Sequence, residues 1–237
     1  MSKLALVTGG SRGIGYAIAE KLAQMGFNLI LMAKTDTNLL SAKHDLLQSN
    51  PNIRVDTVAV DFADSAAVEI AALALTQNHP QIDILVNSAG VLSIEFEHAS
   101  AATLTSLFSI NCISTMVLTN AIAAQMKRSR TGHIINIASL AGKTHLPKIG
   151  AYAATKAALI SYSESLYKSL LPHDVKVSCL SPSVVNTEMT NDGRIANQDK
   201  IQTEEIVNAV IFILSLGKGA QLPQLDINCT PIALAQL

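Results

Sequence analysis

The feature that most limits the fold of this 237-residue chain is a regular alternation of short apolar runs with longer segments of helical periodicity. The segments between the runs predict helices at residues 13–25, 37–49, 65–77, 100–127, 152–171 and 203–216. The runs themselves, rich in β-branched residues, predict strands at residues 3–8, 27–33, 54–60, 82–87, 133–138, 175–180 and 225–227. Repeated strand–helix–strand units of this kind favour a doubly wound parallel sheet of about seven strands, in a single α/β domain over residues 1–237.

Charge and cysteine content exclude several classes of function. Seventeen basic and eighteen acidic residues leave a net charge of −1, which argues against nucleic acid and anionic membranes as partners. The three cysteines, Cys112, Cys179 and Cys229, lack the spacing of a metal site, so we expect reduced thiols and no metal. The amino terminus does not resemble a signal peptide, and no run reaches about 18 consecutive apolar residues. A cytoplasmic location is therefore expected.

The first strand enters the first helix through a glycine-rich turn at residues 8–15, with the sequence TGGSRGIG. Unpaired backbone N–H groups and the helix dipole at such a turn attract a pyrophosphate. The turn is not a phosphate-binding P-loop, because Tyr16 and Ala17 follow Gly15 where that motif has Lys and Ser or Thr. A plain tight turn is the alternative. The residues predicted to contact a cofactor here are Gly9, Ser11, Arg12, Gly13, Ile14 and Gly15.

Tyr152 and Lys156 lie four residues apart in a predicted helix, so both side chains share one face with their Cβ atoms about 5–6 Å apart. Tyr152 alone among the four tyrosines has a cation at that spacing. Lowering the pKa of a phenol from about 10 to about 7 requires roughly 4 kcal/mol. One positive charge at about 4 Å supplies roughly that much at an effective dielectric of about 20. The pair fits proton transfer, although without context a helix-surface contact is equally plausible.

Between the glycine turn and Tyr152, Asn87-Ser88-Ala89-Gly90 ends the fourth strand, and Asp61 follows the third. Together with the glycine turn, the order of these residues over residues 3–189 resembles the short-chain dehydrogenase/reductase family. The resemblance implies a Rossmann-type fold and a nicotinamide cofactor, with Tyr152 as general acid and base. In addition to the turn, the implied cofactor contacts are Asp61 at the adenine, Asn87, Ala89, Gly90, Tyr152, and Lys156 at the ribose. The family's catalytic four match Asn111, which would hold a water, Ser139, which would bind the substrate oxygen, Tyr152 and Lys156.

The end of the second strand should read the 2′ position of the adenosine ribose. Lys34 there offers a positive charge for a 2′-phosphate, and Arg12 in the glycine turn can approach from the other side. This pair is similar to that of NADP-preferring family members, so we expect NADP(H), with NAD(H) as the alternative. Asp36 is the competing residue: a strand boundary two residues later would place it at the ribose and favour NAD(H), whereas its simpler role is the N-cap of a helix from residue 37.

The segment after the sixth strand departs from the family pattern. Pro182, Val185 and Thr187 are similar to residues that contact the nicotinamide, but Ser183 replaces a glycine. If that position requires a positive φ, the serine costs on the order of 1 kcal/mol. Polar residues 188–202 then predict a mobile substrate lid, or a plain solvated connection. The resemblance also implies a homodimer or homotetramer packed through residues 100–127 and 152–171.

These observations predict an NADP(H)-dependent oxidoreductase that acts on a small carbonyl or alcohol substrate. A 3-oxoacyl thioester is one candidate, since Arg128, Arg130, Lys143 and Lys148 could meet an acidic carrier, although such charges are more often simply solvated. The alternative is a regulatory protein of the same fold that senses NADP(H) without catalysis. The catalytic four argue against that alternative, because binding alone has no need of Tyr152.

Overall fold

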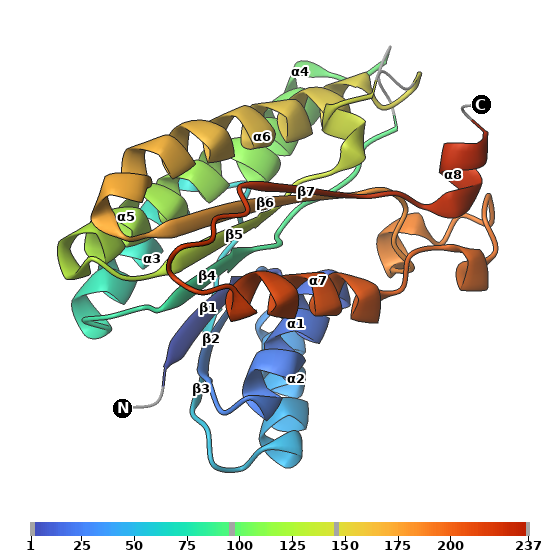
Figure 1. Cartoon of the computed structure of the whole chain (residues 1–237). Coiled ribbons are helices and arrows are strands. Elements are labelled where there is room, and N and C mark those ends of the chain that lie inside the picture. Colours follow the sequence, from blue (N-terminus) through green and yellow to red (C-terminus); the bar gives the residue numbers. More distant parts are fainter. Residues whose placement is uncertain (1–2, 95–97, 145–146, 236–237) are drawn as a thin grey trace.

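The computed structural model describes residues 3–94, 98–144 and 147–235, and its centre is one seven-stranded sheet (Figure 1). The strands pair in parallel in the order β3-β2-β1-β4-β5-β6-β7. They are β1 (Leu4–Thr8), β2 (Asn28–Ala33), β3 (Val55–Ala59), β4 (Ile84–Asn87), β5 (His133–Ile137), β6 (Lys176–Pro182) and β7 (Gln224–Ile227). The predicted doubly wound parallel sheet is confirmed. The extreme ends of the predicted domain lie outside the described residues.

Helices cover both faces of this sheet (Figure 1). One face packs on α1 (Gly13–Gln24), α2 (Asp36–Ser49) and α7 (Thr203–Ser215). The other packs on α3 (Ser65–Asn78), α5 (Ser114–Ser129) and α6 (Gly150–Leu170). Alternation along each strand supplies both cores: in β1, Ala5 and Val7 face the first layer and Leu6 faces the second. Because both faces are covered, the central strands β1, β2 and β4 are apolar at nearly every position rather than at every second residue.

The predicted helix over residues 100–127 is not one regular helix. It consists of α4 (Ala101–Phe108), a π-helical turn η1 (Ser109–Ile113) and α5. A π turn inserts one extra residue into the helical repeat and re-aims the side chains on either side of it. Asn111 lies at the centre of this insertion.

Smaller differences occur elsewhere. α6 begins two residues before Tyr152, at Gly150, and ends at Leu170, where the short turn η3 (Leu171–His173) takes over. A last helix, α8 (Thr230–Leu234), was not predicted. The segment Ala101–Ser129 is long and apolar enough to span a membrane by length and composition, but 56% of its most apolar window is buried in the protein, as in a core helix.

The strand order positions the binding site. β1 lies between β2 and β4, so the chain leaves β1 toward one side of the sheet and later returns to pair with its other side. Ligands of such sheets bind beyond the carboxyl ends of the strands where the order reverses. Thr8 and Asn87, which end β1 and β4, are direct partners in the sheet and mark this place.

Candidate active site

The glycine turn is built for close approach of a ligand to the backbone. Gly9 and Gly13 have φ of 63° and 57°, which other residues rarely adopt. A Cβ at Gly15 would lie 2.4 Å from the carbonyl oxygen of Gly9, so the first turn of α1 packs directly on the loop. The side chain of Arg12, the N-cap residue of α1, makes no capping hydrogen bond, so it leaves the first N–H groups of the helix available to an anion.

Thr8 fastens this turn to the end of β4. Its hydroxyl accepts hydrogen bonds from the backbone N–H groups of Ser88 and Ala89, both at 3.1 Å. Thr8 is fully buried. Thr8 belongs to the glycine-rich motif, but its role is not visible in the sequence because its partners lie about eighty residues further along the chain.

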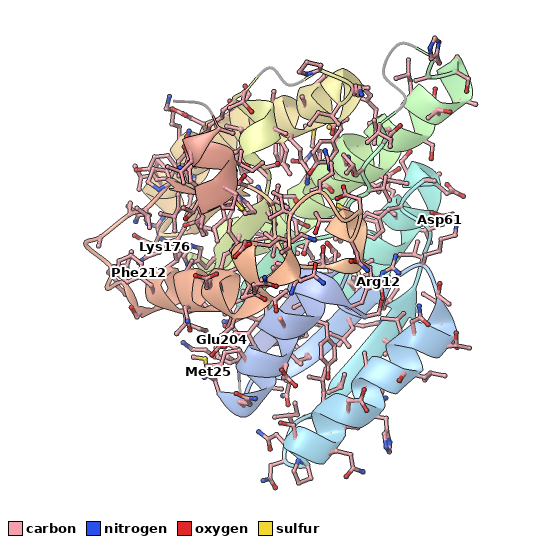
Figure 2. All side chains as sticks on the ribbon, turned by 90° about the vertical axis from the view of Figure 1, so that its right-hand side faces the viewer. Arg12, Met25, Asp61, Lys176, Glu204 and Phe212 are labelled. Carbon is pink, nitrogen blue, oxygen red and sulfur yellow. The ribbon has the colours of Figure 1, made fainter. Side chains whose placement is uncertain are left out.

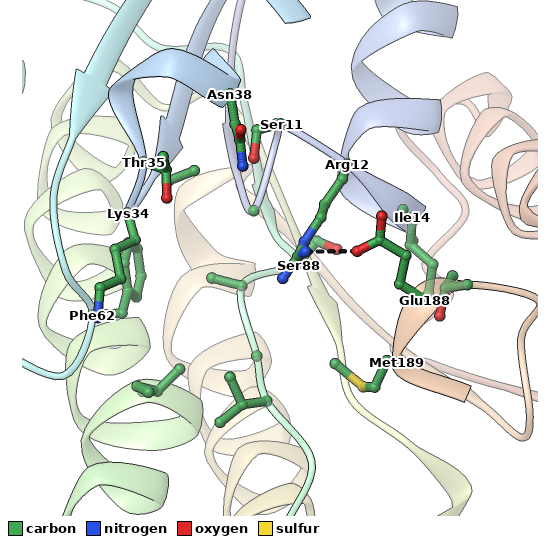
Figure 3. A pocket seen from close by; sticks show the side chains of 18 of the residues that line it. Ser11, Arg12, Ile14, Lys34, Thr35, Asn38, Phe62, Ser88, Glu188 and Met189 are labelled. Carbon is green, nitrogen blue, oxygen red and sulfur yellow. Dashed lines mark hydrogen bonds and ion pairs between the residues drawn. The ribbon is translucent and has the colours of Figure 1, made fainter. Parts of the chain in front are cut away.

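A cavity of about 650 Å³ opens in front of the turn (Figure 3). Most of the predicted cofactor contacts line it, together with residues that the sequence analysis did not single out. The predicted lining residues are Gly9, Ser11, Arg12, Gly13, Ile14, Lys34, Asp61, Ala89, Gly90 and Thr187; the additional ones are Ala33, Thr35, Asn38, Val60, Phe62, Ser88, Val91, Ile110, Glu188 and Met189.

Both cations of this cavity are paired with carboxylates. Lys34 Nζ lies 2.7 Å from Asp61 Oδ2, and Arg12 Nη1 donates to Glu188 Oε2 at 2.6 Å. A dashed line joins the Arg12 guanidinium to the Glu188 carboxylate, and Lys34 lies apart from this pair on the other side of the cavity (Figure 3). The hydrogen bond from Lys34, with a second from the Ala63 N–H, holds the pKa of Asp61 below its usual value. The structure therefore gathers the two predicted cations in one cavity without joining them.

Arg12 and Asp61, which both line the cavity, lie on the same side of the molecule, apart from Met25 just after α1 and from Glu204 and Phe212 on α7 (Figure 2). β2 ends at Ala33, so Lys34 is the first residue beyond the strand, as predicted. The predicted N-cap role of Asp36 is wrong: Thr35 holds the cap position and Asp36 is the first helical residue. A carboxylate there stabilises the positive end of the helix dipole. Thr35 and Asn38 line the cavity, but Asp36 does not.

A second, smaller hollow of about 90 Å³ adjoins the first and shares Ile14, Ser88, Gly90, Thr187 and Met189 with it. Except for Asn111, the other predicted reactive and nicotinamide-contacting residues line it, which are Ser139, Tyr152, Lys156, Pro182 and Val185.

Within this hollow, Lys156 is held beside Tyr152. Lys156 is 5% exposed, and its Nζ donates to the carbonyl of Ile137 at 3.1 Å and lies 5.7 Å from the centre of the Tyr152 ring. The Ser139 hydroxyl accepts from the N–H of Ala141 and so caps the short helix η2 (Leu140–Gly142). Its simple capping role and its place in the hollow therefore coexist. Proton transfer and a hydrogen bond to a substrate oxygen both fit this arrangement.

Asn111 lines neither hollow. It lies behind the cavity wall, which separates its side chain from solvent. Its Oδ1 accepts from the N–H of Val91 at 2.9 Å, and its Nδ2 donates to the carbonyl of Val91 at 2.9 Å and to Thr155 Oγ1 at 3.1 Å. A Cβ on Gly90 would lie 3.3 Å from Asn111 Oδ1 and 3.5 Å from Lys156 Nζ. Gly90 thus lets the backbone run between the cavity and these two polar groups.

Asn87 and Gly15 also lie behind the cavity wall. Asn87 is 2% exposed, and its Nδ2 donates to Thr119 Oγ1 and to Asn136 Oδ1, both at 2.8 Å. Its position supports the sheet below the cavity. The strain anticipated at Ser183 is absent, because Ser183 is not among the described residues with positive φ and donates its N–H to the carbonyl of Ile227 at 2.8 Å.

Residues 188–202, predicted as a lid, form two short turns, η4 (Glu188–Thr190) and η5 (Asn197–Asp199). The buried ammonium of Lys200 joins them by donating to the carbonyl of Thr190 at 2.7 Å and to Asn197 Oδ1 at 2.8 Å. A bridge between Val185 and Ile201 ties the base of the segment to the chain leaving β6. Its motion stays a prediction.

Two of the four basic residues proposed to meet an acidic carrier pair with carboxylates. Arg130 comes just before β5 begins, at the end of the sheet opposite the cavity, and pairs with Asp174 at 2.8 Å. Lys143 pairs with Asp226 on β7 at 2.7 Å. Contact of the basic residues with a carrier stays a prediction.

Comparisons with known proteins agree with this geometry. The family described as short chain dehydrogenase matches residues 3–198. An uncharacterized oxidoreductase of Staphylococcus saprophyticus is 34% identical over 213 residues, which are 90% of this chain and 91% of that protein. A metagenomic short-chain oxidoreductase in complex with NADP is 29% identical with a TM-score of 0.83, over 95% of this chain and 96% of that one. A β-ketoacyl-[ACP] reductase from Bacteroides thetaiotaomicron is 27% identical with a TM-score of 0.84, over 99% of both chains.

Proposed function

The chain belongs to the short-chain dehydrogenase family and is an oxidoreductase of CH–OH and C=O groups, and from this premise we propose that it reduces a carbonyl substrate with NADPH, with Tyr152 as the proton donor. The single observation that carries the proposal is the hollow in which Tyr152, Lys156 and Ser139 converge beside the large cavity. The opposite direction, alcohol oxidation, uses the same groups in reverse.

The residues present fit a nicotinamide dinucleotide. The uncapped N-terminus of α1 and the tight glycine turn suit a pyrophosphate, and a Cβ at Gly9 would lie 3.0 Å from the Ala89 N–H nitrogen and the Ser88 carbonyl. Lys34 and Arg12 would hold the adenosine end. Lys156, Val185 and Thr187 would hold the nicotinamide end, next to Tyr152. When bound, the dihydronicotinamide supplies the hydride.

Protein groups then carry the proton chemistry. Ser139 would donate a hydrogen bond to the substrate oxygen and orient it. Tyr152 would give its phenolic proton to that oxygen as negative charge develops there, and the Lys156 ammonium would stabilise the phenolate that remains. General acid catalysis of this kind contributes about 10²–10⁴-fold to a rate.

A preference for NADP(H) is supported by two cations and by the position of Lys34 directly after β2. An acidic residue at that position would accept from a free 2′-hydroxyl and repel a 2′-phosphate. The related oxidoreductase bound to NADP points to the same cofactor.

For the substrate, we favour an apolar carbonyl compound, with 3-oxoacyl thioesters as the first class to test. Val91, which lines the large cavity, and Met189, which lines both hollows, are 39% and 46% exposed. A β-ketoacyl-[ACP] reductase is among the similar structures. We also propose a homodimer or homotetramer in the cytoplasm, packed through residues 100–127 and 152–171, which light scattering of the purified protein tests.

The proposal is tested by NADPH consumption against aldehydes, ketones, quinones and 3-oxoacyl thioesters. We expect Tyr152→Phe to lower turnover at least about 100-fold with unchanged melting temperature. Tyr162→Phe, which removes a phenol on the same helix that donates to Asn120 Oδ1, is the matched control and should keep turnover. Full activity of Tyr152→Phe refutes the acid–base role. NADPH binding without turnover of any substrate class favours the sensing protein instead.

A further inference from the structure

Thr155 occupies a junction that the four expected catalytic residues do not explain. It lies on α6 between Tyr152 and Lys156 and is fully buried. Its hydroxyl donates to the carbonyl of Tyr152 at 2.7 Å and accepts from Asn111 Nδ2 at 3.1 Å. One hydroxyl group therefore bonds to the helix that carries the proposed acid and to the π turn of the neighbouring helix.

The π turn contacts this residue twice. In addition to Asn111, the thiol of Cys112 donates to the carbonyl of Thr155 at 3.1 Å. Burial raises the pKa of the Cys112 thiol, so it stays protonated and able to donate. Asn111 and Cys112, two consecutive residues of the π turn, therefore both bond to Thr155 on α6.

The bonds continue from Asn111 to the cavity wall. Asn111 holds the backbone of Val91 by both its N–H and its carbonyl, and it packs behind Gly90 beside Lys156 Nζ. Gly90 and Val91 both line the large cavity. A continuous set of hydrogen bonds thus runs from the Tyr152 carbonyl through Thr155 and Asn111 to the loop after β4.

We propose that Thr155 is a positioning residue, which through its hydroxyl fixes Asn111, and hence Lys156 and the Gly90–Val91 wall, relative to Tyr152. The inference rests on the proposed function of Tyr152. Thr155 touches neither hollow, so it acts through its neighbours and not on substrate. Without the hydroxyl, one amide hydrogen of buried Asn111 loses its acceptor, and such a group moves until it finds another.

The test compares three variants in turnover and in its dependence on pH. Thr155→Val keeps the shape but removes the hydroxyl, and Thr155→Ser keeps the hydroxyl. Thr119→Val is the matched control, because Thr119 is equally buried, on α5, and its hydroxyl accepts from Asn87 Nδ2. The titratable groups around Thr155 are Tyr152 and Lys156 on α6 and Cys112 on η1.

We expect Thr155→Val to lower kcat about tenfold, to leave the Kd for NADPH within about twofold, and to move the pH of half-maximal alcohol oxidation upward. Thr155→Ser should restore both kcat and the pH profile. Thr119→Val should lower the melting temperature but keep the profile. Should Thr155→Val not fold, Thr155→Ala, which adds no atom where the hydroxyl was, carries the same expectation.

The result that overturns the inference is a wild-type kcat and pH profile in Thr155→Val or Thr155→Ala, or a loss in Thr155→Ser as large as theirs. That failure is distinct from failure of the proposed function. If Tyr152→Phe is inactive while Thr155→Val is normal, only the positioning role falls. If Tyr152→Phe is active, both the positioning role and the proposed function are refuted.

Discussion

Glu188→Gln should strengthen the binding of NADPH while leaving that of NADH unchanged. In the protein without cofactor, the Glu188 carboxylate holds the Arg12 guanidinium at 2.6 Å across the cavity. A 2′-phosphate that binds Arg12 must first separate the guanidinium from the carboxylate. NADH lacks this phosphate, so its binding leaves the ion pair intact. Neutral glutamine removes the competition without changing the size of the side chain.

The magnitude follows from the exposure of the pair. The two side chains are 71% and 75% exposed, so solvent screens the attraction strongly. Exposed pairs contribute about 0.2–1 kcal/mol, which corresponds to roughly a 1.4- to 5-fold lower Kd for NADPH in the variant. The gain should shrink in high salt, because ions screen the pair in the wild-type protein too.

Calorimetric titration with NADPH and NADH in low and high salt measures this directly. Asp174→Asn is the matched control, since it breaks an exposed arginine pair of similar geometry, with Arg130, at the end of the sheet opposite the cavity. Lys34→Ala should act in the other direction and weaken NADPH about tenfold by removing a charged hydrogen bond. Equal gains for both cofactors in Glu188→Gln, or weaker NADPH binding, would refute the competition; native preference for NADH would refute the cofactor assignment.

Two further predictions concern stability. Gly15→Ala should abolish cofactor binding and lower the free energy of unfolding by about 1–3 kcal/mol, because its Cβ would meet the Gly9 carbonyl at 2.4 Å. Gly217→Ala is the control, because a Cβ at Gly217 would enter open space. Cofactor binding by a stable Gly15→Ala variant would contradict the turn geometry. Burial lowers the pKa of His133 to about 4, below its ordinary value of 6.5, so the unfolded chain binds the proton more readily. Stability is then full above pH 6.5 and falls by roughly 3 kcal/mol toward pH 4. Denaturant titrations of the native protein and His133→Gln should differ in slope over that range, and parallel curves would sink the assignment.

The elements that local patterns specify were predicted well. All seven strands were found within two residues at either end. The central strands β1, β2 and β4 are nearly continuous apolar runs and stand out from the polar turns around them. The glycine turn and the Tyr152–Lys156 spacing could also be predicted from the sequence, since each depends on residues a few positions apart. Lys34 was placed correctly for the same reason.

Features that depend on distant contacts were not predicted. The partner of Arg12 is 176 positions away, so the sequence suggested a free cation where the structure has an ion pair. Asn111 was predicted within one regular helix over residues 100–127, but it lies in a π turn whose side-chain partners, Val91 and Thr155, are on other elements. Asp36 was misassigned because a one-residue shift of a helix start leaves almost no trace in local composition.

Buried polar residues below the site are linked by hydrogen bonds. Asn87 donates to Asn136, Asn136 donates to Ser163, and Ser163 donates to the carbonyl of Leu159 on α6. Burying such groups costs free energy unless each finds a partner, so an apolar core would be the simpler solution here. These hydrogen bonds instead form a series that runs below the cavity from the end of β4 to the helix that carries Tyr152. Hydrogen bonds depend on direction more strongly than apolar contacts do, so these bonds restrict how β4, β5 and α6 align. A site that needs Tyr152 and the cofactor turn in register gains from that restriction, which explains why polar residues gather under this edge of the sheet.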